Sequence, residues 1–333
     1  MTKRILCVFL TLVLSIGMLW ACKKTSGMPD GAVEDDNTNK DKEDAGEMPA
    51  YHFGYTCINM DNPYFESLKL SIETAVRESG STLTVYDPAG DSAQQLEQIN
   101  QMIEEGVDAA FVCPVDWEAI QPGIDALREA DIPIINIDTE VKDIDHVTAY
   151  VGSDNKNAGY VCGEDLLIRK RNGGRIVVLE SKNMNSVIDR ITGFEEAIAG
   201  GGFEVVERVD AMGEKERART EVERILAAND VIDAIMCGND QMALGALEAV
   251  TAADRSDILI YGVDGSPEIK AEIAKGTSPV IGTGAQSPIN IGKTAVDTAL
   301  AILNGDEFEK MTYEETFLIN RSNVELYGTD GWQ

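Results

Sequence analysis

The chain has 333 residues, of which 44% are hydrophobic and 26% are charged, with 28 Lys and Arg against 58 Asp and Glu and a net charge of −30. A chain of this length is enough for two domains of ordinary size. A charge this negative repels the phosphates of nucleic acid and the headgroups of anionic lipids. Nucleic acid is therefore excluded as a partner, and an anionic ligand is disfavoured.

The amino terminus has the layout of a secretory signal. Lys3 and Arg4 precede an apolar stretch over residues 5–20, as in segments that direct export. Leu19-Trp20-Ala21-Cys22 resembles the lipobox of bacterial lipoproteins, in which the cysteine is acylated, although Trp20 is bulkier than the residue usual there. An uncleaved membrane anchor is the alternative. Both interpretations predict an exported and tethered protein, lipid-anchored at Cys22 in the first case.

Residues 23–50 are rich in Lys, Asp, Glu, Asn, Thr, Gly and Pro and contain scarcely any large apolar side chain. Such a segment cannot bury enough apolar surface to offset the entropy of ordering, so we predict a flexible acidic linker. The four later cysteines show no CxxC spacing; they are Cys57, Cys113, Cys162 and Cys237. Buried free thiols are the favoured interpretation, and a Cys57–Cys113 disulfide remains the alternative.

From residue 51 onward, short apolar runs alternate with helical periodicity, which predicts a series of strand–helix units and hence parallel sheets. The first block has strands at 52–58, 82–86, 109–113 and 133–137 and helices at 64–79, 92–105 and 117–130. The second has strands at 147–151, 175–179, 203–209, 233–237, 257–262 and 279–283 and helices at 156–170, 187–200, 214–228, 240–253 and 267–275. Two such blocks in series predict two similar α/β lobes.

The last part of the chain follows a different pattern. A helix is predicted at 288–304, ending at Gly305 as a helix C-terminus should, and a strand-like run, YEETFLIN, follows at 313–320. The pattern alone assigns neither element to a lobe.

The corner at residues 234–249, AIMCGNDQMALGALEA, is where a buried strand ends and a helix begins. In open α/β sheets, ligands bind outside the carboxyl ends of the strands. Asn239 and Asp240 at this corner are therefore candidate ligand contacts, and the alternative is that both only cap the helix.

Other predicted strand ends carry similar polar or aromatic groups. In the first block they are Asn59, Asp61, Asn62, Pro63, Tyr64, Phe65, Asp116, Trp117 and Asp138, and in the second Asn185, Arg190, Asn239, Asp240, Asp264, Ser266 and Gln286. Carboxylates, amides and a guanidinium bind vicinal hydroxyls by paired hydrogen bonds, and aromatic faces cover the apolar face of a sugar ring. This set predicts a carbohydrate or polyol pocket. Helix caps, local ion pairs and core aromatics are the alternatives for individual members.

Several stretches, in order and at the expected spacing, resemble the ribose-binding-protein group of type I periplasmic sugar-binding proteins, the solute receptors of ABC transporters. They are INMDNPYFESL at 58–68, IPIINID at 132–138, VGSDNKNAG at 151–159, DRITGF at 189–194, GNDQMALGALEA at 238–249, YGVDGSPE at 261–268 and AQSPINIG at 285–292. The resemblance covers essentially all of residues 51–328 and implies two doubly wound parallel-sheet lobes joined by a three-crossing hinge. It assigns residues 51–153 and 287–316 to an N-terminal lobe, and residues 154–286 and 317–328 to a C-terminal lobe.

The resemblance also implies which residues hold the ligand. The positions that match the ligand contacts of the family are Asn62, Tyr64, Phe65, Asp138, Arg190, Asn239, Asp264 and Gln286. Asn239 is then the ligand contact at its corner and Asp240 the helix cap.

Two departures concern the ligand. Ribose-specific members have an arginine after the Asp138 position, where this chain has Thr139, and an aromatic where it has Met212-Gly213. Losing one charged donor and one stacking face weakens ribose binding by at least a few kcal/mol unless something replaces them. We therefore expect a differently hydroxylated sugar or a cyclic polyol, with Trp117 as a substitute stacking surface.

The leading hypothesis is a monomeric, extracytoplasmic sugar receptor, without cofactor or metal, that presents its ligand to an ABC permease in the membrane. Delivery to a membrane sensor kinase or chemoreceptor is the alternative. An enzyme is less favoured, because the chain has two histidines and lacks the GxSxG, P-loop and dinucleotide-binding motifs; only a glycosidase pair, Asp138 and Asp264, would suit. A sugar-responsive repressor would need a DNA-binding headpiece, and residues 1–50 offer none.

Overall fold

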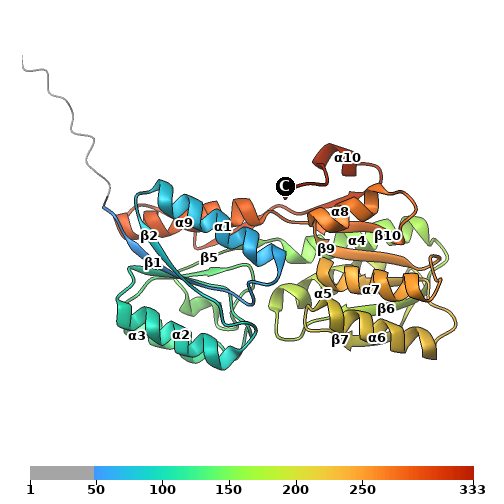
Figure 1. Ribbon diagram of the computed structural model, residues 1–333, viewed down its shortest axis with the longest axis horizontal. Helices are drawn as coiled ribbons and strands as arrows, with labels where there is room; N and C mark the ends of the chain where they lie inside the picture. The colour runs from blue at the N-terminus through green and yellow to red at the C-terminus, as the bar shows by residue number, and fades with distance from the viewer. Residues whose placement is uncertain (1–48) are drawn as a thin grey trace, which may run out of the picture. The chain divides into compact units, whose positions relative to one another are not determined.

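The computed structural model describes residues 49–333, which form two sheets of six strands each, with helices packed around them (Figure 1). Residues 49–333 belong to one compact unit. The predicted signal peptide, the lipobox cysteine Cys22 and nearly all of the predicted linker lie outside the described residues.

The N-terminal lobe is built on a sheet with the strand order β11-β5-β4-β3-β1-β2, in which every neighbouring pair is parallel. Its strands are β1 (His52–Thr56), β2 (Thr82–Tyr86), β3 (Ala109–Val112), β4 (Ile134–Ile137), β5 (Ala149–Ser153) and β11 (Met311–Glu314). Its helices are α1 (Pro63–Glu78), α2 (Ser92–Glu105), α3 (Gln121–Glu129), the short η1 (Ile144–His146) and α9 (Pro288–Asn304). In Figure 1, α1 and α9 lie on one side of this sheet, and α2 and α3 lie on the other.

The C-terminal lobe repeats this arrangement with the order β12-β10-β9-β8-β6-β7. Its strands are β6 (Gly174–Glu180), β7 (Phe203–Asp210), β8 (Ala234–Cys237), β9 (Leu259–Asp264), β10 (Val280–Ala285) and β12 (Phe317–Asn320). Its helices are α4 (Asn155–Arg169), α5 (Asn185–Ile198), α6 (Lys215–Ala228), α7 (Asp240–Ala252), α8 (Pro267–Ala274) and α10 (Val324–Tyr327). Only β12 runs antiparallel to its neighbour, β10.

The central strands are apolar because helices cover both of their faces. Every residue of β3, β4 and β8 is buried, as expected for parallel strands with a helix layer on each side. Between the N-terminal sheet and helices α2 and α3, the apolar core contains Ile99, Met102, Ile124, Leu127, Ala110 and Val112. This packing fixes the strand ends from which the candidate ligand residues project.

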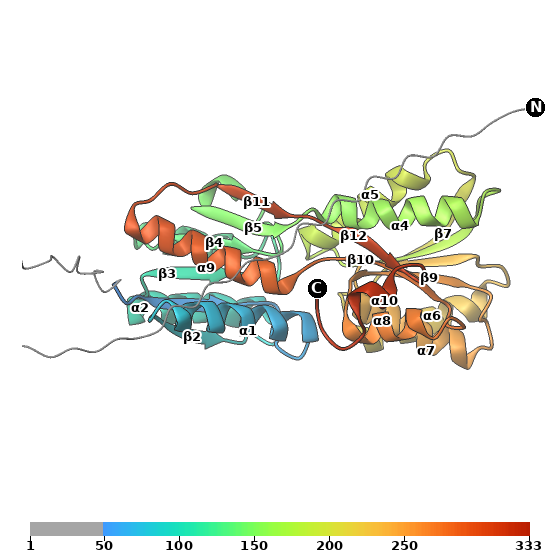
Figure 2. The same cartoon turned by 90° about the horizontal axis from the view of Figure 1, so that it is seen from above.

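The chain passes between the lobes three times: after β5, after β10, and between β11 and β12 (Figure 2). The first and third crossings are tied together. Thr316 Oγ1 donates to Asp154 O at 2.9 Å, and Asn157 Nδ2 donates to Thr316 O at 2.8 Å. The predicted fold class, two parallel-sheet lobes joined by a three-crossing hinge, is confirmed.

Two predicted elements were wrong in detail. The run at 313–320 is two strands, β11 and β12, one in each sheet, because the hydrogen bonds of Thr316 hold the chain at the crossing between them. The helix predicted at 117–130 begins only at Gln121. Before it, the Asp116 carboxylate accepts hydrogen bonds from Glu118 N and Ala119 N, both at 2.9 Å, which holds residues 116–119 in a turn.

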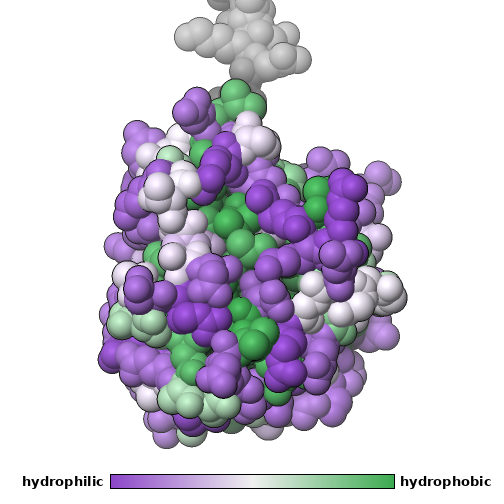
Figure 3. Space-filling model, turned by 90° about the vertical axis from the view of Figure 1, so that its right-hand side faces the viewer, coloured by the Kyte–Doolittle hydropathy of each residue, from purple (hydrophilic) through white to green (hydrophobic). Residues whose placement is uncertain are grey.

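One end of the molecule presents a largely hydrophilic face. Figure 3 shows the end of the C-terminal lobe, where hydrophilic residues cover most of the face and apolar ones lie between them in small groups. From residue 49 onward, the structure contains no helix both long and apolar enough to cross a membrane. Cys57, Cys113, Cys162 and Cys237 are free and buried, as the favoured interpretation of the sequence predicted.

Candidate functional site

The carboxyl ends of strands from both lobes face one another, and polar side chains from both meet there. They enclose a free volume of about 20 Å³, lined by Asn62, Tyr64, Phe65, Asp138, Met184, Ser186, Val187, Arg190, Asn239, Asp264 and Gln286. This is roughly the space of one water molecule. A ligand the size of a monosaccharide therefore enters only when the lobes separate.

The N-terminal lobe contributes the start of α1. Asn62 caps this helix, since its Oδ1 accepts a hydrogen bond from Tyr64 N at 3.0 Å, and Pro63 occupies the first turn. The cap directs two aromatic rings into the junction between the lobes. Tyr64 and Phe65 pack edge to face with ring centroids 5.3 Å apart, and both are buried.

Asp138 follows β4 and is held in a left-handed backbone conformation, with φ of 64°. Two hydrogen bonds hold the backbone in this conformation: Asp138 N donates to Val151 O at 3.0 Å, and the Tyr150 hydroxyl donates to Asp138 O at 2.9 Å. The Tyr64 hydroxyl donates to Asp138 Oδ1 at 2.7 Å. Strained backbone held in this way is common at ligand sites, and here it points the carboxylate of Asp138 toward Tyr64.

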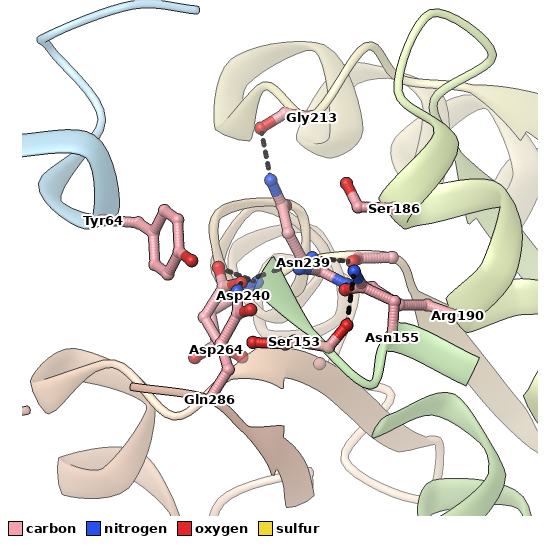
Figure 4. A network of polar contacts seen from close by, with 12 residues as sticks. Tyr64, Ser153, Asn155, Ser186, Arg190, Gly213, Asn239, Asp240, Asp264 and Gln286 are labelled. Carbon is pink, nitrogen blue, oxygen red and sulfur yellow. Dashed lines mark hydrogen bonds and ion pairs between the residues drawn. The ribbon is translucent and has the colours of Figure 1, made fainter. Parts of the chain in front are cut away.

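The C-terminal lobe contributes a denser network (Figure 4). Arg190, on α5, donates from Nε to Asn155 Oδ1 at 2.8 Å and from Nη1 to Gly238 O at 2.9 Å and to Asp264 Oδ1 at 3.3 Å. Gln286 Nε2 donates to the same Asp264 oxygen at 2.8 Å. The guanidinium, the carboxylate and the amide therefore hold one another in place without help from the other lobe.

Two carboxyl groups lie side by side in this network. Asp264 Oδ2 accepts from Asp240 N at 3.4 Å, and both residues are buried. Burial raises the pKa of the Asp264 carboxyl, and the neighbouring Asp240 adds to the rise, while Arg190 opposes it. Burial likewise raises the pKa of Asp240, against the hydrogen bonds that Asp240 accepts. Asp264 is a strong hydrogen-bond partner for a ligand hydroxyl in either protonation state.

The structure corrects the roles predicted at the corner before α7. Asn239, not Asp240, is the N-cap of this helix, because its Oδ1 accepts from Met242 N at 2.9 Å. Asp240 instead accepts from Ser266 N at 2.7 Å and from Thr283 Oγ1 at 2.8 Å, deep in the C-terminal lobe. Asn239 caps the helix, and the Asp240 carboxylate is instead engaged by the Ser266 amide and the Thr283 hydroxyl. Asn239 still lines the site, with its Nδ2 donating to Gly213 O at 3.1 Å.

Gln286 offers an unused acceptor. Its Oε1 is buried and has no hydrogen-bond partner among residues 49–333. A buried acceptor without a partner costs about 1–3 kcal/mol. A donor supplied by a ligand would remove that cost.

Trp117 is not among the residues that line the site. It lies at the rim, where its N donates to Asn183 O across the junction at 3.1 Å, because the turn at 116–119 precedes α3. Two further bonds join the lobes: Asn183 Nδ2 donates to Val115 O at 2.8 Å, and Thr139 Oγ1 and Ser186 Oγ are 2.6 Å apart. Trp117 therefore belongs to the contact between the lobes.

Sequence reasoning missed Met184, Ser186 and Val187, which line the site from the start of α5. It singled out Asn185 there, whose Nδ2 instead donates to Asp189 Oδ2 at 3.1 Å. The polar Ser186 in the first turn after a strand end was the available signal. The two apolar residues carried none, because they look like core positions.

A second hollow of about 180 Å³ adjoins the site at Ser186 and is lined partly by Glu140, Asp189 and Tyr313. Within residues 49–333, no group of three or more His, Cys, Asp or Glu side chains is arranged to hold a metal ion. What the site offers is a set of neutral and charged hydrogen-bonding groups together with aromatic rings.

Comparison with known proteins agrees with this geometry. The model of the periplasmic binding protein domain matches residues 53–307. The chain therefore belongs to the periplasmic binding protein family. The ribose import binding protein of Bacillus subtilis strain 168 is 30% identical over 300 residues, which covers 90% of this chain and 93% of the relative.

Solved structures show the same similarity. An ABC transporter solute binding protein from Bacillus halodurans C-125 with bound myo-inositol is 26% identical, with a TM-score of 0.79 and coverage of 85% of this chain and 98% of that chain. A periplasmic solute binding protein from Actinobacillus succinogenes 130z with bound D-allose is 26% identical, with a TM-score of 0.76 and coverage of 83% and 100%. The family and these relatives are solute-binding proteins, which confirms the prediction that the chain is not an enzyme.

Proposed function

We propose that this protein is the extracytoplasmic receptor of an ABC-type carbohydrate importer and that it closes its two lobes over a monosaccharide or a cyclic polyol. The observation that carries the proposal is the meeting of hydrogen-bonding groups from both lobes around one enclosed site, including the unpartnered Gln286 Oε1. The names of the relatives, which include ribose, allose and inositol binders, point to the same ligand class.

The roles follow from the chemistry of each group. Asp138 and Asp264 accept hydrogen bonds from ring hydroxyls, and Arg190, Asn62 and Asn239 donate from nitrogen. Gln286 accepts through its free Oε1. Tyr64 and Phe65 cover an apolar ring face. Closure excludes water, so each of these bonds strengthens as the local dielectric falls.

We propose a narrower class of ligand for this protein than the range of sugars that the family binds. Thr139 engages Ser186 across the junction and supplies no cationic donor. Gly213 has φ of 74°, which strains any side chain there, and a Cβ atom would lie 3.1 Å from Met184 Cε and 3.2 Å from Asn239 Nδ2, so the site has no aromatic ring at this corner. We therefore propose a hexose or a cyclic polyol rather than ribose.

The protein is proposed to work at the outer face of the cell membrane, tethered through acylated Cys22 and the linker at 23–50. The bodies that move on closure are residues 51–153 with 287–316, and residues 154–286 with 317–328, in a monomer. Mass spectrometry of the membrane fraction is expected to find acyl chains on Cys22 as the first residue of the mature chain. An intact segment 1–21 ahead of an unmodified Cys22 would contradict the lipid anchor.

A thermal-shift screen of the chain without residues 1–22 tests the ligand class. A ligand that binds only the folded state raises the melting temperature by mass action. We expect a hit among hexoses and inositols and a smaller shift with ribose. No shift with any pentose, hexose, inositol or nucleoside would contradict the proposal, and pull-down with membrane proteins distinguishes a permease from a sensor kinase or chemoreceptor.

A further inference from the structure

The last described residues, 328–333, return to the junction between the lobes after α10; we call this segment the strap. Figure 2 shows the carboxyl-terminal marker at the junction between the lobes, and Gln333 contacts Gln286, the residue directly after β10. The match to the periplasmic binding protein domain ends at residue 307, before the strap begins.

A buried lysine fixes the strap to the C-terminal lobe. Lys270, on α8, has no exposed surface, and its Nζ donates to Gly331 O at 2.6 Å and to Gln333 Oε1 at 3.1 Å. A buried ammonium is costly unless hydrogen bonds satisfy it. Lys270 therefore selects the position of the strap.

Gln333 then contacts the backbone of two candidate ligand residues. Its Nε2 donates to Gln286 O at 2.8 Å and to Asp264 O at 3.2 Å. Gly265 permits this approach, since it has φ of 78° and a Cβ atom there would lie 2.3 Å from Gln333 Nε2. The strap thus supports the strand ends that hold Asp264 and Gln286.

Trp332 contacts the other lobe. Its ring lies edge on to that of Tyr64, with centroids 5.7 Å apart and an interplanar angle of 74°. Tyr64 in turn donates to Asp138 at 2.7 Å. One six-residue segment therefore touches ligand residues of both lobes.

We propose that the strap latches the closed form and that Trp332 is a positioning residue that acts through Tyr64 to slow ligand release. The inference rests on the proposed function, because release is defined only for a bound ligand. Opening the lobes must separate Tyr64 from Trp332, or Gln333 from the C-terminal lobe. The strap therefore acts mainly on the dissociation rate constant.

Stopped-flow measurement on the full-length protein, with the sugar identified by the screen, tests the latch. Trp332→Ala is expected to raise the dissociation rate constant about threefold to tenfold, the range expected from loss of one aromatic pair, and to leave the association rate constant nearly unchanged. Trp332→Phe keeps an aromatic ring at this position, so its dissociation rate constant should stay close to that of the wild type. Leu326→Ala is the control, because Leu326 is 84% exposed and should change neither constant. A Trp332→Ala dissociation rate constant equal to that of the wild type would overturn the latch.

Hydrogen exchange without ligand separates the two proposals. If the wild type binds no sugar, the proposed function fails, yet the strap is still measurable. Lys270→Met is expected to speed exchange of the amides of Gly265 and Gln286, because Lys270 holds the strap against these strand ends within the C-terminal lobe. Exchange rates equal to those of the wild type in this variant would overturn the strap whatever the ligand screen shows.

Discussion

The two halves of the site are built differently. In the C-terminal lobe, Arg190, Asp264 and Gln286 form a closed network of side chains, and Arg190 is further held by Asn155 and Gly238. In the N-terminal lobe, Tyr64 and Phe65 pack edge to face. The Asp138 carboxylate accepts from the Tyr64 hydroxyl at 2.7 Å, from Thr139 Oγ1 at 3.4 Å and from Cys113 Sγ at 3.6 Å. The C-terminal half is thus a platform held by a charged network, and the N-terminal half is a cover in which neutral donors hold the Asp138 carboxylate.

Because of this difference, substitutions in the two halves should affect the free energy of unfolding and the ligand affinity differently. Changes in the platform should lower both the free energy of unfolding and the ligand affinity, since they leave buried charges without partners. A change at Asp138, in the cover, should lower mainly the ligand affinity.

The largest effect is expected for Arg190→Met, in the platform. Removing Arg190 leaves three buried acceptors, Asn155 Oδ1, Gly238 O and Asp264 Oδ1, short of a donor, at about 1–3 kcal/mol each. Urea unfolding should show this loss, and calorimetry should show no ligand binding. Arg128→Met is the control, because the Arg128–Asp125 pair is solvent-exposed and such pairs contribute at most about 1 kcal/mol. Equal stability losses in the two variants would contradict a platform.

Asp138→Asn, in the cover, should weaken binding with little change in stability. A hydrogen bond to a charged group contributes about 1.5–3 kcal/mol, so we expect affinity to fall about tenfold to a hundredfold, measured by calorimetry. Asp131→Asn is a matched control, because Asp131 is exposed and has the same left-handed backbone, with φ of 56° against 64° for Asp138. A large drop in melting temperature for Asp138→Asn would mean that this carboxylate is structural.

The pH dependence of stability is a property of the platform. Burial raises the pKa of Asp264 and of Asp240 in the folded protein. A raised folded pKa means that the folded state holds the proton more tightly. The stabilisation is therefore complete below the unfolded value of about 3.9 and is lost as the pH rises through the raised pKa. Urea unfolding measured from about pH 4 to about pH 8, which spans this window, should show the free energy of unfolding falling as the pH rises.

Asp264→Asn should make that fall shallower, because it removes one of the two titrating groups. The rest of the acidic chain provides a built-in reference, since its contribution is common to both proteins. Identical slopes for the variant and the wild type would show that the buried pair does not titrate in this range.

The smallest effect is expected at the contact between the two halves. Thr139 Oγ1 and Ser186 Oγ are 2.6 Å apart across the junction, and one such hydrogen bond contributes about 0.5–1.5 kcal/mol. Thr139→Val and Ser186→Ala should each weaken ligand binding by up to about tenfold, and the double variant should weaken it no more than either alone. Strictly additive losses in calorimetry would show that the two hydroxyls do not act together on closure.

The fold was readable from the sequence where local pattern and global packing agree. The short apolar runs that became β3, β4 and β8 are buried on both faces, so periodicity and Gly or Pro boundaries identified them. The pattern failed at residues 313–320, because a chain that crosses between sheets keeps strand character on both sides of Thr316. Only the resemblance to a known family indicated that crossing.

Candidate site residues were predictable at the carboxyl ends of strands, as at Asp138 just after β4 and Asp264 at the end of β9. Their partners were not, because the choice between Asn239 and Asp240 as helix cap depends on Ser266 and Thr283, more than 20 residues away along the chain. Trp332 carried no signal at all, since nothing in the sequence around it places it beside Tyr64.

Small-angle scattering with the sugar identified by the screen tests directly whether the two lobes close over the ligand. Hinge closure brings two domains together around the ligand. We predict that saturating sugar lowers the radius of gyration of the wild type and that Arg190→Met shows no such change. A radius of gyration that stays constant while calorimetry reports binding would contradict it.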